Sequence, residues 1–577
     1  MSTYNQASFA GGMNLRVDDT RLKPDQYKVA FNVRNRVDTL EPILGSAKDV
    51  SIPAGLKQGI LTFGNYIICF VAGSAYYRYY NGEGWQKIDG FKMSSEAPRY
   101  WFEEVPLATT NYLRQAIDPT TPLSGASAGN GIALNAIAAA SQGNLPGLLV
   151  QDNINQPLFI YVDINGFIQV RTTQSYAEWN VDWAAYTIEK DKREYVPIGN
   201  AMKFVDGKLY IVAPDGGVIL QSVSGRPLDF VINVDTDGYK GGDAYSTAYS
   251  VGVGGITALH QLSDGSLYVA AGNANFIVAK NMTPNAITIF GEYTFIRKFL
   301  FNSTCLDDRC IVDSLGDTRF IDLGGIRSFN AIQQLQNEGR NSVFSVTLNG
   351  ALGDIRQTAG ASAAILYDNY ELYAIQTIFG NVIAVYDSIN EIWVGFDTNQ
   401  VGGKRVKQFA KIELDIQRLY AITEDDQLYT LYIGPSFDTA SVRPVSVCAN
   451  VLQIEDKPIA NALQHQVKPL DFRCILNGAT ADFTASVSCF VDNRITVGEQ
   501  TKTIRYAAPV TPYAGPVDLP DVDTQLSSLY WTFPNAAQGW KTFFLLSWTG
   551  GAELTQISVT VKDETPRQPL NTQATTS

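Results

Sequence analysis

The sequence predicts an all-β protein: a β-propeller with an N-terminal arm, an inserted loop region and a C-terminal β-sandwich. A short alternating apolar run with a Leu-Tyr pair occurs four times, with its tyrosines at Tyr210, Tyr268, Tyr373 and Tyr420. Phe320 marks a further unit midway between Tyr268 and Tyr373. Alternation predicts half-buried strands, and a spacing of about 50 residues is typical of propeller blades or repeat arrays. One such unit cannot bury its apolar face alone, so the units must pack on each other.

The composition supports strands and tight turns. The 577 residues include 29 tyrosines, 28 phenylalanines and 48 glycines, and the 45% hydrophobic content is ample for a core. The opening stretch 1–16 is polar and glycine-containing, unlike a signal peptide. No apolar run reaches 18 residues, so we expect no membrane span.

Charge and histidine content narrow the function classes. The net charge is -13, and only 18% of residues are charged. A general nucleic-acid-binding surface needs a dense basic face, which this balance disfavours. If the protein lined a channel, an acidic or neutral channel wall would still let a DNA duplex pass without adhering to it. With two histidines in the chain, His-based catalysis and multi-His metal sites are disfavoured.

The six cysteines are sparse and show no C-x-x-C spacing. Cys305 and Cys310 are the closest pair; a disulfide or half of a zinc site is one interpretation. No second pair follows at zinc-finger spacing, so we expect buried free thiols in a reducing compartment.

The chain divides into four segments. Residues 1–50 form an N-terminal arm with the first strands, and residues 51–440 form the propeller. Residues 91–150 interrupt the strand pattern with a stretch rich in alanine and glycine, which predicts an insertion. Residues 441–562 form the β-sandwich, and residues 563–577 are a polar tail.

The sandwich assignment rests on a change of pattern after Pro435. Seven strand-like runs follow, and prolines cluster between Pro509 and Pro520. The runs are Val442–Val451, Phe472–Ile475, Phe483–Phe490, Thr501–Arg505, Tyr530–Phe533, Lys541–Trp548 and Ile557–Val561.

Two stretches carry a family resemblance. The first has the order F-x-G-G-x-N from Phe9 to Asn14, L-x-x-x-Q from Leu22 to Gln26, and L-E-P from Leu40 to Pro42. The second, Cys305–Asn330, has a strand, a Gly-Asp turn and a G-I-R-S run ending at Ser328. Both resemble the nozzle, or tubular, tail proteins of short-tailed phages, which are built around a β-propeller.

The resemblance implies a structural virion protein without a cofactor or catalytic residues. Such a protein assembles in the host cytoplasm as a ring of six copies below the portal and adaptor. It lines the genome-ejection conduit, contacts DNA in transit without sequence-specific binding, and anchors fibres or spikes. Six-fold symmetry comes from the family and not from these residues.

Five residues are candidates for partner contact. Lys404, Arg405 and Lys407 form a small basic loop, either a solvated loop or a contact with a partner subunit or DNA. Trp179 and Trp183 are the aromatic candidates for an alternative function, a host-receptor or glycan-binding propeller of the virion.

Other motifs are interpreted structurally. Asn233–Gly238, with Asp235 and Asp237, resembles the first half of a calcium loop, but Ala244 stands at the twelfth position, so we expect a polar turn. Ser263–Gly265 resembles a sialidase Asp box without its tryptophan, and paired carboxylates for a glycosidase are not identifiable. His260 and His465 are expected to be structural because no nucleophile accompanies them.

Overall fold

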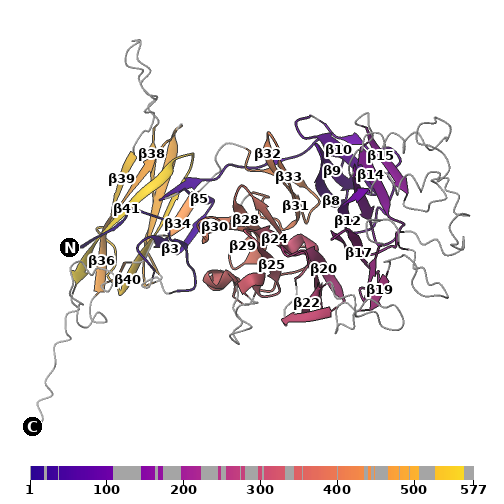
Figure 1. The fold of residues 1–577 in the computed structure, drawn as a ribbon. Helices are drawn as coiled ribbons and strands as arrows, with labels where there is room; N and C mark the ends of the chain where they lie inside the picture. The colour runs from indigo at the N-terminus through magenta and orange to yellow at the C-terminus, as the bar shows by residue number, and fades with distance from the viewer. Residues whose placement is uncertain are drawn as a thin grey trace, which may run out of the picture.

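The computed structural model describes residues 2–564 with gaps. The longer gaps are 108–144, 173–195, 223–229, 231–244, 249–254, 280–295, 332–343, 434–439, 449–465 and 506–526, and the shorter ones span four residues or fewer. The described strands form a propeller and a sandwich joined by the N-terminal segment (Figure 1).

The propeller consists, in the described residues, of seven consecutive antiparallel units (Figure 1). Blade 1 contains β8 (Lys57–Phe63), β9 (Tyr66–Val71), β10 (Ser74–Tyr79) and β11 (Gln86–Lys87). Blade 2 contains β12 (Trp101–Leu107), β13 (Leu145–Gln151), β14 (Leu158–Val162) and β15 (Ile168–Thr172). Blade 3 contains β16 (Met202–Val205), β17 (Lys208–Val212), β18 (Val218–Gln221) and β19 (Tyr245–Ala248).

The later blades follow the same hairpin order. Blade 4 contains β20 (Ile256–Gln261), β21 (Leu267–Ala271), β22 (Ala274–Ala279) and β23 (Ile296–Phe301), and blade 5 contains β24 (Ile311–Ser314), β25 (Asp317–Asp322) and β26 (Gly325–Ser328). Blade 6 contains β27 (Ala363–Tyr367), β28 (Tyr370–Thr377), β29 (Gly380–Asp387) and β30 (Ile392–Asp397). Blade 7 contains β31 (Val406–Glu413), β32 (Gln417–Thr423) and β33 (Leu428–Leu431).

The first strands of the blades form the inner wall of the ring. β12 contacts β16, β16 contacts β20, β24 contacts β27, and β27 contacts β31. β31 in turn contacts β8, so the last blade lies against the first. A buried apolar cluster with Ile60 and Ile67 of blade 1 and Ile412 and Tyr420 of blade 7 closes the circle. The blades therefore bury their apolar faces against each other, as the repeat predicts.

The repeated Leu-Tyr run forms the second strand of its blade. It occurs in β17, β21, β28 and β32, and Phe320 has the equivalent place in β25. Tyr268, Tyr373 and Tyr420 are fully buried between blades. The Leu-Tyr pattern thus marks the inter-blade core and confirms the propeller.

Blade 2 differs from the expectation of an insertion at 91–150. β12 lies within that range and β13 within all but its last residue; they pair from Trp101↔Gln151 to Leu107↔Leu145. Residues 108–144 lie outside the described residues. β13 begins Leu-Pro-Gly, a sequence typical of a turn. Gly147 is required there by packing, because a Cβ would lie 1.7 Å from the Phe159 ring.

The N-terminal segment, expected as an arm, supplies strands to both parts of the protein. β1 (Ser2–Gln6), β5 (Val33–Arg36) and β6 (Thr39–Pro42) belong to one sandwich sheet, and β4 (Val29–Phe31) belongs to the other. β7 (Ala47–Lys48) pairs with β33 and completes blade 7. Between these strands, β2 (Gly12–Met13) pairs in parallel with β3 (Gln26–Tyr27).

The C-terminal strands complete the sandwich, with its two sheets in the order β39-β36-β41-β6-β5 and β4-β34-β40-β37-β38. Phe472 and Phe544 lie across its core with ring centroids 5.1 Å apart, and Trp531 and Trp548 are buried beside them. The strands are β34 (Ala440–Arg443), β35 (Val447–Cys448), β36 (Gln466–Asn477), β37 (Phe483–Val491), β38 (Arg494–Ile504), β39 (Ser527–Thr532), β40 (Lys541–Trp548) and β41 (Glu553–Glu564).

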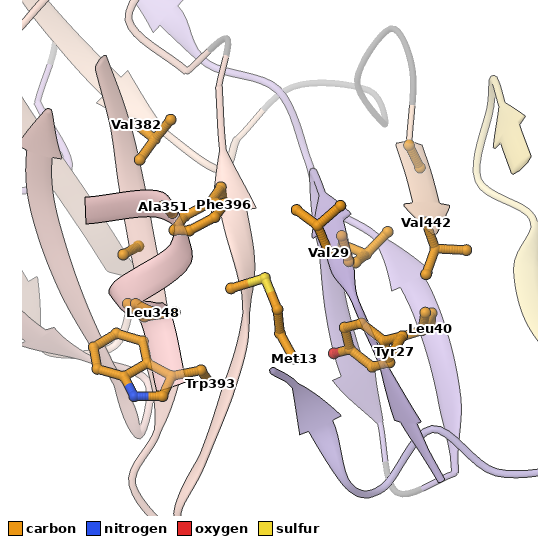
Figure 2. Close-up of a cluster of buried hydrophobic side chains, with 14 of the residues drawn as sticks. Met13, Tyr27, Val29, Leu40, Leu348, Ala351, Val382, Trp393, Phe396 and Val442 are labelled. Atoms are coloured by element: carbon orange, nitrogen blue, oxygen red, sulfur yellow. The ribbon is translucent and has the colours of Figure 1, made fainter. Parts of the chain in front are cut away.

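Propeller and sandwich share a sheet and a hydrophobic core. The outer strand of blade 6, β30, pairs with β4 at Phe396↔Phe31, so one sheet continues from the propeller into the sandwich. Figure 2 shows Met13 between Trp393 and Phe396 on one side and Tyr27 on the other. The short helices η6 (Phe344–Leu348) and α5 (Asn349–Leu352) add apolar side chains on the propeller side.

Asp49 fixes the closing strand β7 between blades 7 and 1. Its amide donates to the Leu428 carbonyl at 2.8 Å. Its carboxylate accepts from Trp85 Nε1 at 3.0 Å and from the Ser51 hydroxyl at 2.6 Å, and it pairs with Arg78 at 3.1 Å. Burial alone would raise the pKa of Asp49, but these hydrogen bonds and the Arg78 charge outweigh it and hold the pKa below its usual value.

Asp49→Asn is expected to lower the free energy of unfolding at pH 7 by about 2 kcal/mol, because it removes the charge from several hydrogen bonds to a carboxylate whose side chain is 7% exposed. A carboxyl group whose pKa is lower in the folded than in the unfolded protein stabilises the fold fully at pH values above its ordinary pKa of about 4. This stabilisation is lost as the pH falls through the pKa of the folded protein. Urea unfolding of both proteins at several pH values tests this. The difference must shrink below about pH 4; a difference that is independent of pH contradicts the assignment.

Candidate functional site

The connection from blade 4 to blade 5 lies on the propeller axis. It contains the 3-10 helix η5 (Asp308–Cys310), which contacts β20, β27 and β31. Arg309 Nη2 donates to the carbonyls of Gln58 in β8 and Tyr100 just before β12, both at 3.2 Å. A segment that meets the inner strands of so many blades must lie where they converge.

Four charged side chains make up the axial cluster: Arg99, Asp307, Asp308 and Arg309. Arg99 Nη1 contacts Asp307 Oδ2 and its Nη2 contacts Asp308 Oδ1, both at 2.5 Å. Asp307 also caps η5, because its Oδ1 accepts from the Arg309 amide at 3.0 Å. Arg99 precedes blade 2 and the two aspartates precede blade 5, so the ion pairs join opposite sides of the ring.

The pKa values in the axial cluster follow from burial and charge balance. Burial opposes ionisation of Asp307, but Arg99 and Arg309 hold its pKa well below the usual range. Burial and the adjacent Asp307 raise the pKa of Asp308 to about 7 against the opposing effect of Arg99. Burial and the nearby Arg99 lower the pKa of Arg309 to about 9. The charged groups of the axial cluster pair with one another across the axis, as expected of a structural plug.

The sequence signal for the axial cluster is the run Asp307-Asp308-Arg309 just before a blade. Nothing in the sequence near this run, or near Arg99, indicates that these charges are partners. The pairing of Arg99 with residues about 200 positions away in the chain is visible only in the folded ring.

The basic residues predicted to share a loop are divided in the structure: Lys404 and Arg405 lie in the connection between blades 6 and 7, and Lys407 lies in β31, the first strand of blade 7. Lys407 Nζ pairs with Asp426 at 2.7 Å, and Arg405 contacts Gln376 at 3.3 Å and Glu424 at 4.0 Å. Lys404 is exposed and borders a small hollow that Arg405 also lines. Two of the three cations are therefore held by neighbours in the propeller, and the third, Lys404, is exposed.

Several other candidates lie outside the described residues. These are Trp179, Trp183, the Asp235–Asp237 stretch and His465.

The remaining motifs have local partners. His260 Nε2 lies 2.8 Å from Asp313 Oδ2, between the first strands of blades 4 and 5. Asp264 accepts from the Ser266 amide at 2.9 Å within the β20–β21 turn. Cys305 and Cys310 are buried thiols that donate to the carbonyls of Asp307 and Ser362, at 3.0 and 3.3 Å, and burial raises their pKa values. Within the described part of the chain, no three His, Cys, Asp or Glu side chains are grouped to hold a metal ion.

A second buried ion pair lies at the junction of the two domains. Arg34 in β5 donates two hydrogen bonds to the Asp397 carboxylate, at 2.8 and 2.7 Å. The Tyr432 hydroxyl donates to the same carboxylate at 2.6 Å. The Arg34 guanidinium lies over the rings of Tyr370 and Tyr432, 5.3 and 5.1 Å from their centroids. The sequence analysis did not single out this pair.

In the part of the chain that the structure describes, we find no helix with the length and hydropathy needed to traverse a bilayer.

Comparison with known proteins shows distant likeness alone. The chain matches no family model and no curated protein. A catalytically inactive virginiamycin B lyase from Staphylococcus aureus with quinupristin aligns over 68% of this chain and 99% of its own, at 10% identity and a TM-score of 0.35. BBS1N in complex with ARL6DN aligns over 68% and 97%, at 8% identity and a TM-score of 0.33. The propeller assignment rests on the strand pairing of this chain itself.

Proposed function

We propose that this protein is a structural virion protein of a short phage tail, a ring-forming nozzle subunit that lines the genome-ejection conduit. The observation that carries the proposal is the shared N-terminal segment, whose strands enter both sandwich sheets and the last propeller blade. A segment shared in this way, with one core across the junction, resists hinge motion between the domains. Rigidity of this kind suits a wall subunit.

In this proposal the conduit lies outside the propeller axis. Buried side chains and η5 occupy the centre of the propeller ring, so the propeller axis does not serve as the path for DNA. The path instead runs between copies of the chain arranged around a common axis. The net charge of -13 keeps such a lumen from retaining phosphate backbones.

The proposed partners are other copies of this chain, the tail adaptor and portal, and a fibre or spike protein, all in the virion tail. The test is assembly. Mass photometry and negative-stain electron microscopy of the purified chain, alone and with portal–adaptor complexes, should show closed rings on the portal axis. A chain that stays monomeric at micromolar concentration with and without these complexes contradicts the proposal.

Lys404→Glu is expected to leave folding unchanged and to weaken ring or portal assembly about tenfold, because it places a like charge against an acidic partner surface. Stability should change by less than about 0.5 kcal/mol, as for other exposed positions. The matched control is Lys92→Glu, an exposed lysine in the connection between blades 1 and 2. Equal assembly of both variants and the unmodified protein would exclude Lys404 from the interface.

A receptor- or glycan-binding propeller is the second candidate. A group of surface tyrosines on blade 1 favours a carbohydrate contact in this chain, and it is compatible with a structural role.

A further inference from the structure

Blade 1 presents a tyrosine cluster made of Tyr66, Tyr77, Tyr79 and Tyr80. Tyr66 in β9 lies directly opposite Tyr79 in β10, and Tyr77 lies two residues before Tyr79 on the same face of the sheet. Tyr80 follows the strand, and its amide donates to the Asn65 carbonyl at 2.9 Å. Tyr79 is 40% exposed. The four phenol rings therefore gather at one end of the β9–β10 hairpin, where Tyr79 is exposed and the other three are half-buried.

The rings meet at steep angles. Tyr66 lies 5.7 Å from Tyr77 and 5.6 Å from Tyr79, with interplanar angles of 78° and 73°. Tyr79 and Tyr80 are 4.8 Å apart at 49°. Rings arranged edge to face make a corner instead of a flat stack.

Two hydroxyls of the tyrosine cluster donate hydrogen bonds, one to a side-chain amide and one to a carboxylate. The Tyr77 hydroxyl donates to Gln86 Oε1 at 2.6 Å, and the Tyr80 hydroxyl donates to Asp415 Oδ2 at 3.2 Å. Asp415 belongs to the β31–β32 turn of blade 7, where the neighbouring Leu414 is also exposed. Gln86 keeps its amide donors, and Asp415 keeps further acceptor positions for a ligand.

Charge identifies the ligand class. The nearest arginine in the hairpin, Arg78, projects to the opposite face of β10 and is bound to Asp49 and the Tyr420 hydroxyl. The carboxylate of Asp415 would repel a phosphate or sulfate group on the ligand. Phenol faces bind the C–H face of a sugar ring, while an amide and a carboxylate bind its hydroxyls.

We propose that the tyrosine cluster is a binding site for a neutral oligosaccharide of pyranose sugars. One sugar ring lies against the corner of Tyr66 and Tyr79, and its hydroxyls reach Gln86, which pairs with Tyr77 on the same face of the blade. The site would give the virion a weak contact with a surface glycan. Because it belongs to a single blade, it does not depend on ring assembly or on the proposed nozzle function.

The test uses the full chain with neutral hexasaccharides of glucose, galactose, mannose and N-acetylglucosamine. Saturation-transfer NMR and calorimetry should detect binding of at least one of them. Tyr79→Ala should weaken that binding about tenfold, the loss expected for one aromatic contact of about 1.4 kcal/mol. The matched control is Tyr530→Ala on the sandwich, where the tyrosine is 39% exposed and should leave binding unchanged. Circular dichroism checks that both variants fold.

Three results would overturn the proposal. The first is no binding of any hexasaccharide at millimolar concentration, and the second is equal binding by Tyr79→Ala and the unmodified chain. The third is loss of ring assembly by Tyr79→Ala without glycan binding, which would make the cluster an interface between copies. Failure to assemble together with tyrosine-dependent glycan binding would overturn the nozzle function and leave this site intact.

Discussion

Arg34→Ala is expected to lower the free energy of unfolding by about 3–5 kcal/mol, because it leaves a buried carboxylate without its cation. The Asp397 side chain is 0% exposed, and Arg34 supplies two of its hydrogen bonds. The Tyr432 hydroxyl alone does not balance the charge. Since Arg34 lies in a sandwich strand and Asp397 ends a propeller strand, the loss falls on the junction between the domains.

Urea denaturation measures the change, and two variants serve as controls. Arg36 lies in the same strand as Arg34 and forms an exposed ion pair, at 3.4 Å, with Glu41 in β6. Arg36→Ala should lower the free energy of unfolding by less than about 1 kcal/mol. The double variant Arg34→Met with Asp397→Leu should recover most of the stability, because replacing a buried ion pair by apolar groups is often neutral. A single-variant cost below about 1 kcal/mol would mean that the junction does not depend on this pair.

The order of strands along the chain could be predicted from local sequence patterns. The way in which the propeller and the sandwich are joined could not. Alternation around Tyr210, Tyr268, Tyr373 and Tyr420 is a property of neighbouring residues, and it identified the second strand of four blades. The first two strands of blade 2 were not predicted, because Pro146 and Gly147 stand in a strand that this pattern does not mark. Packing against Phe159, and not local propensity, makes Gly147 suitable there.

The N-terminal segment shows the limit of sequence reasoning most clearly. Its short strands are recognisable, but their partners lie hundreds of residues away, as in Ser2↔Val561 and Phe31↔Phe396. No local signal specifies that β7, two residues long, completes the last blade. Arg34 resembles any charged residue near a turn until Asp397 is placed beside it. The basic loop at 404–407 was predicted as a unit, and two of its cations have acidic neighbours on the following hairpin.

Arg99→Ala is expected to lower the free energy of unfolding by about 3–5 kcal/mol as well, because it removes the cation of a buried ion pair. Arg99 is the cation shared by Asp307 and Asp308, and without it two adjacent carboxylates keep only Arg309. Burial opposes ionisation of both carboxylates, and the Arg99 charge offsets it in the unmodified protein. Without Arg99 the carboxylates gain protons or draw water into the axis. The blades that meet at η5 should then separate locally.

Hydrogen exchange distinguishes this effect from a general loss of stability. Peptides containing Gln58 and Tyr100 should lose protection together with the η5 peptide, because Arg309 binds both carbonyls from η5. Sandwich peptides should keep theirs. The control Arg473→Ala removes an arginine whose side chain is 58% exposed, 4.0 Å from Asp471, and should change neither region. Uniform loss of protection across both domains would show that the axial cluster stabilises the whole chain, and no loss near Gln58 would show that it does not bind the ring together. Local loss, by contrast, would identify the axis as the point where the seven blades are held to a common centre.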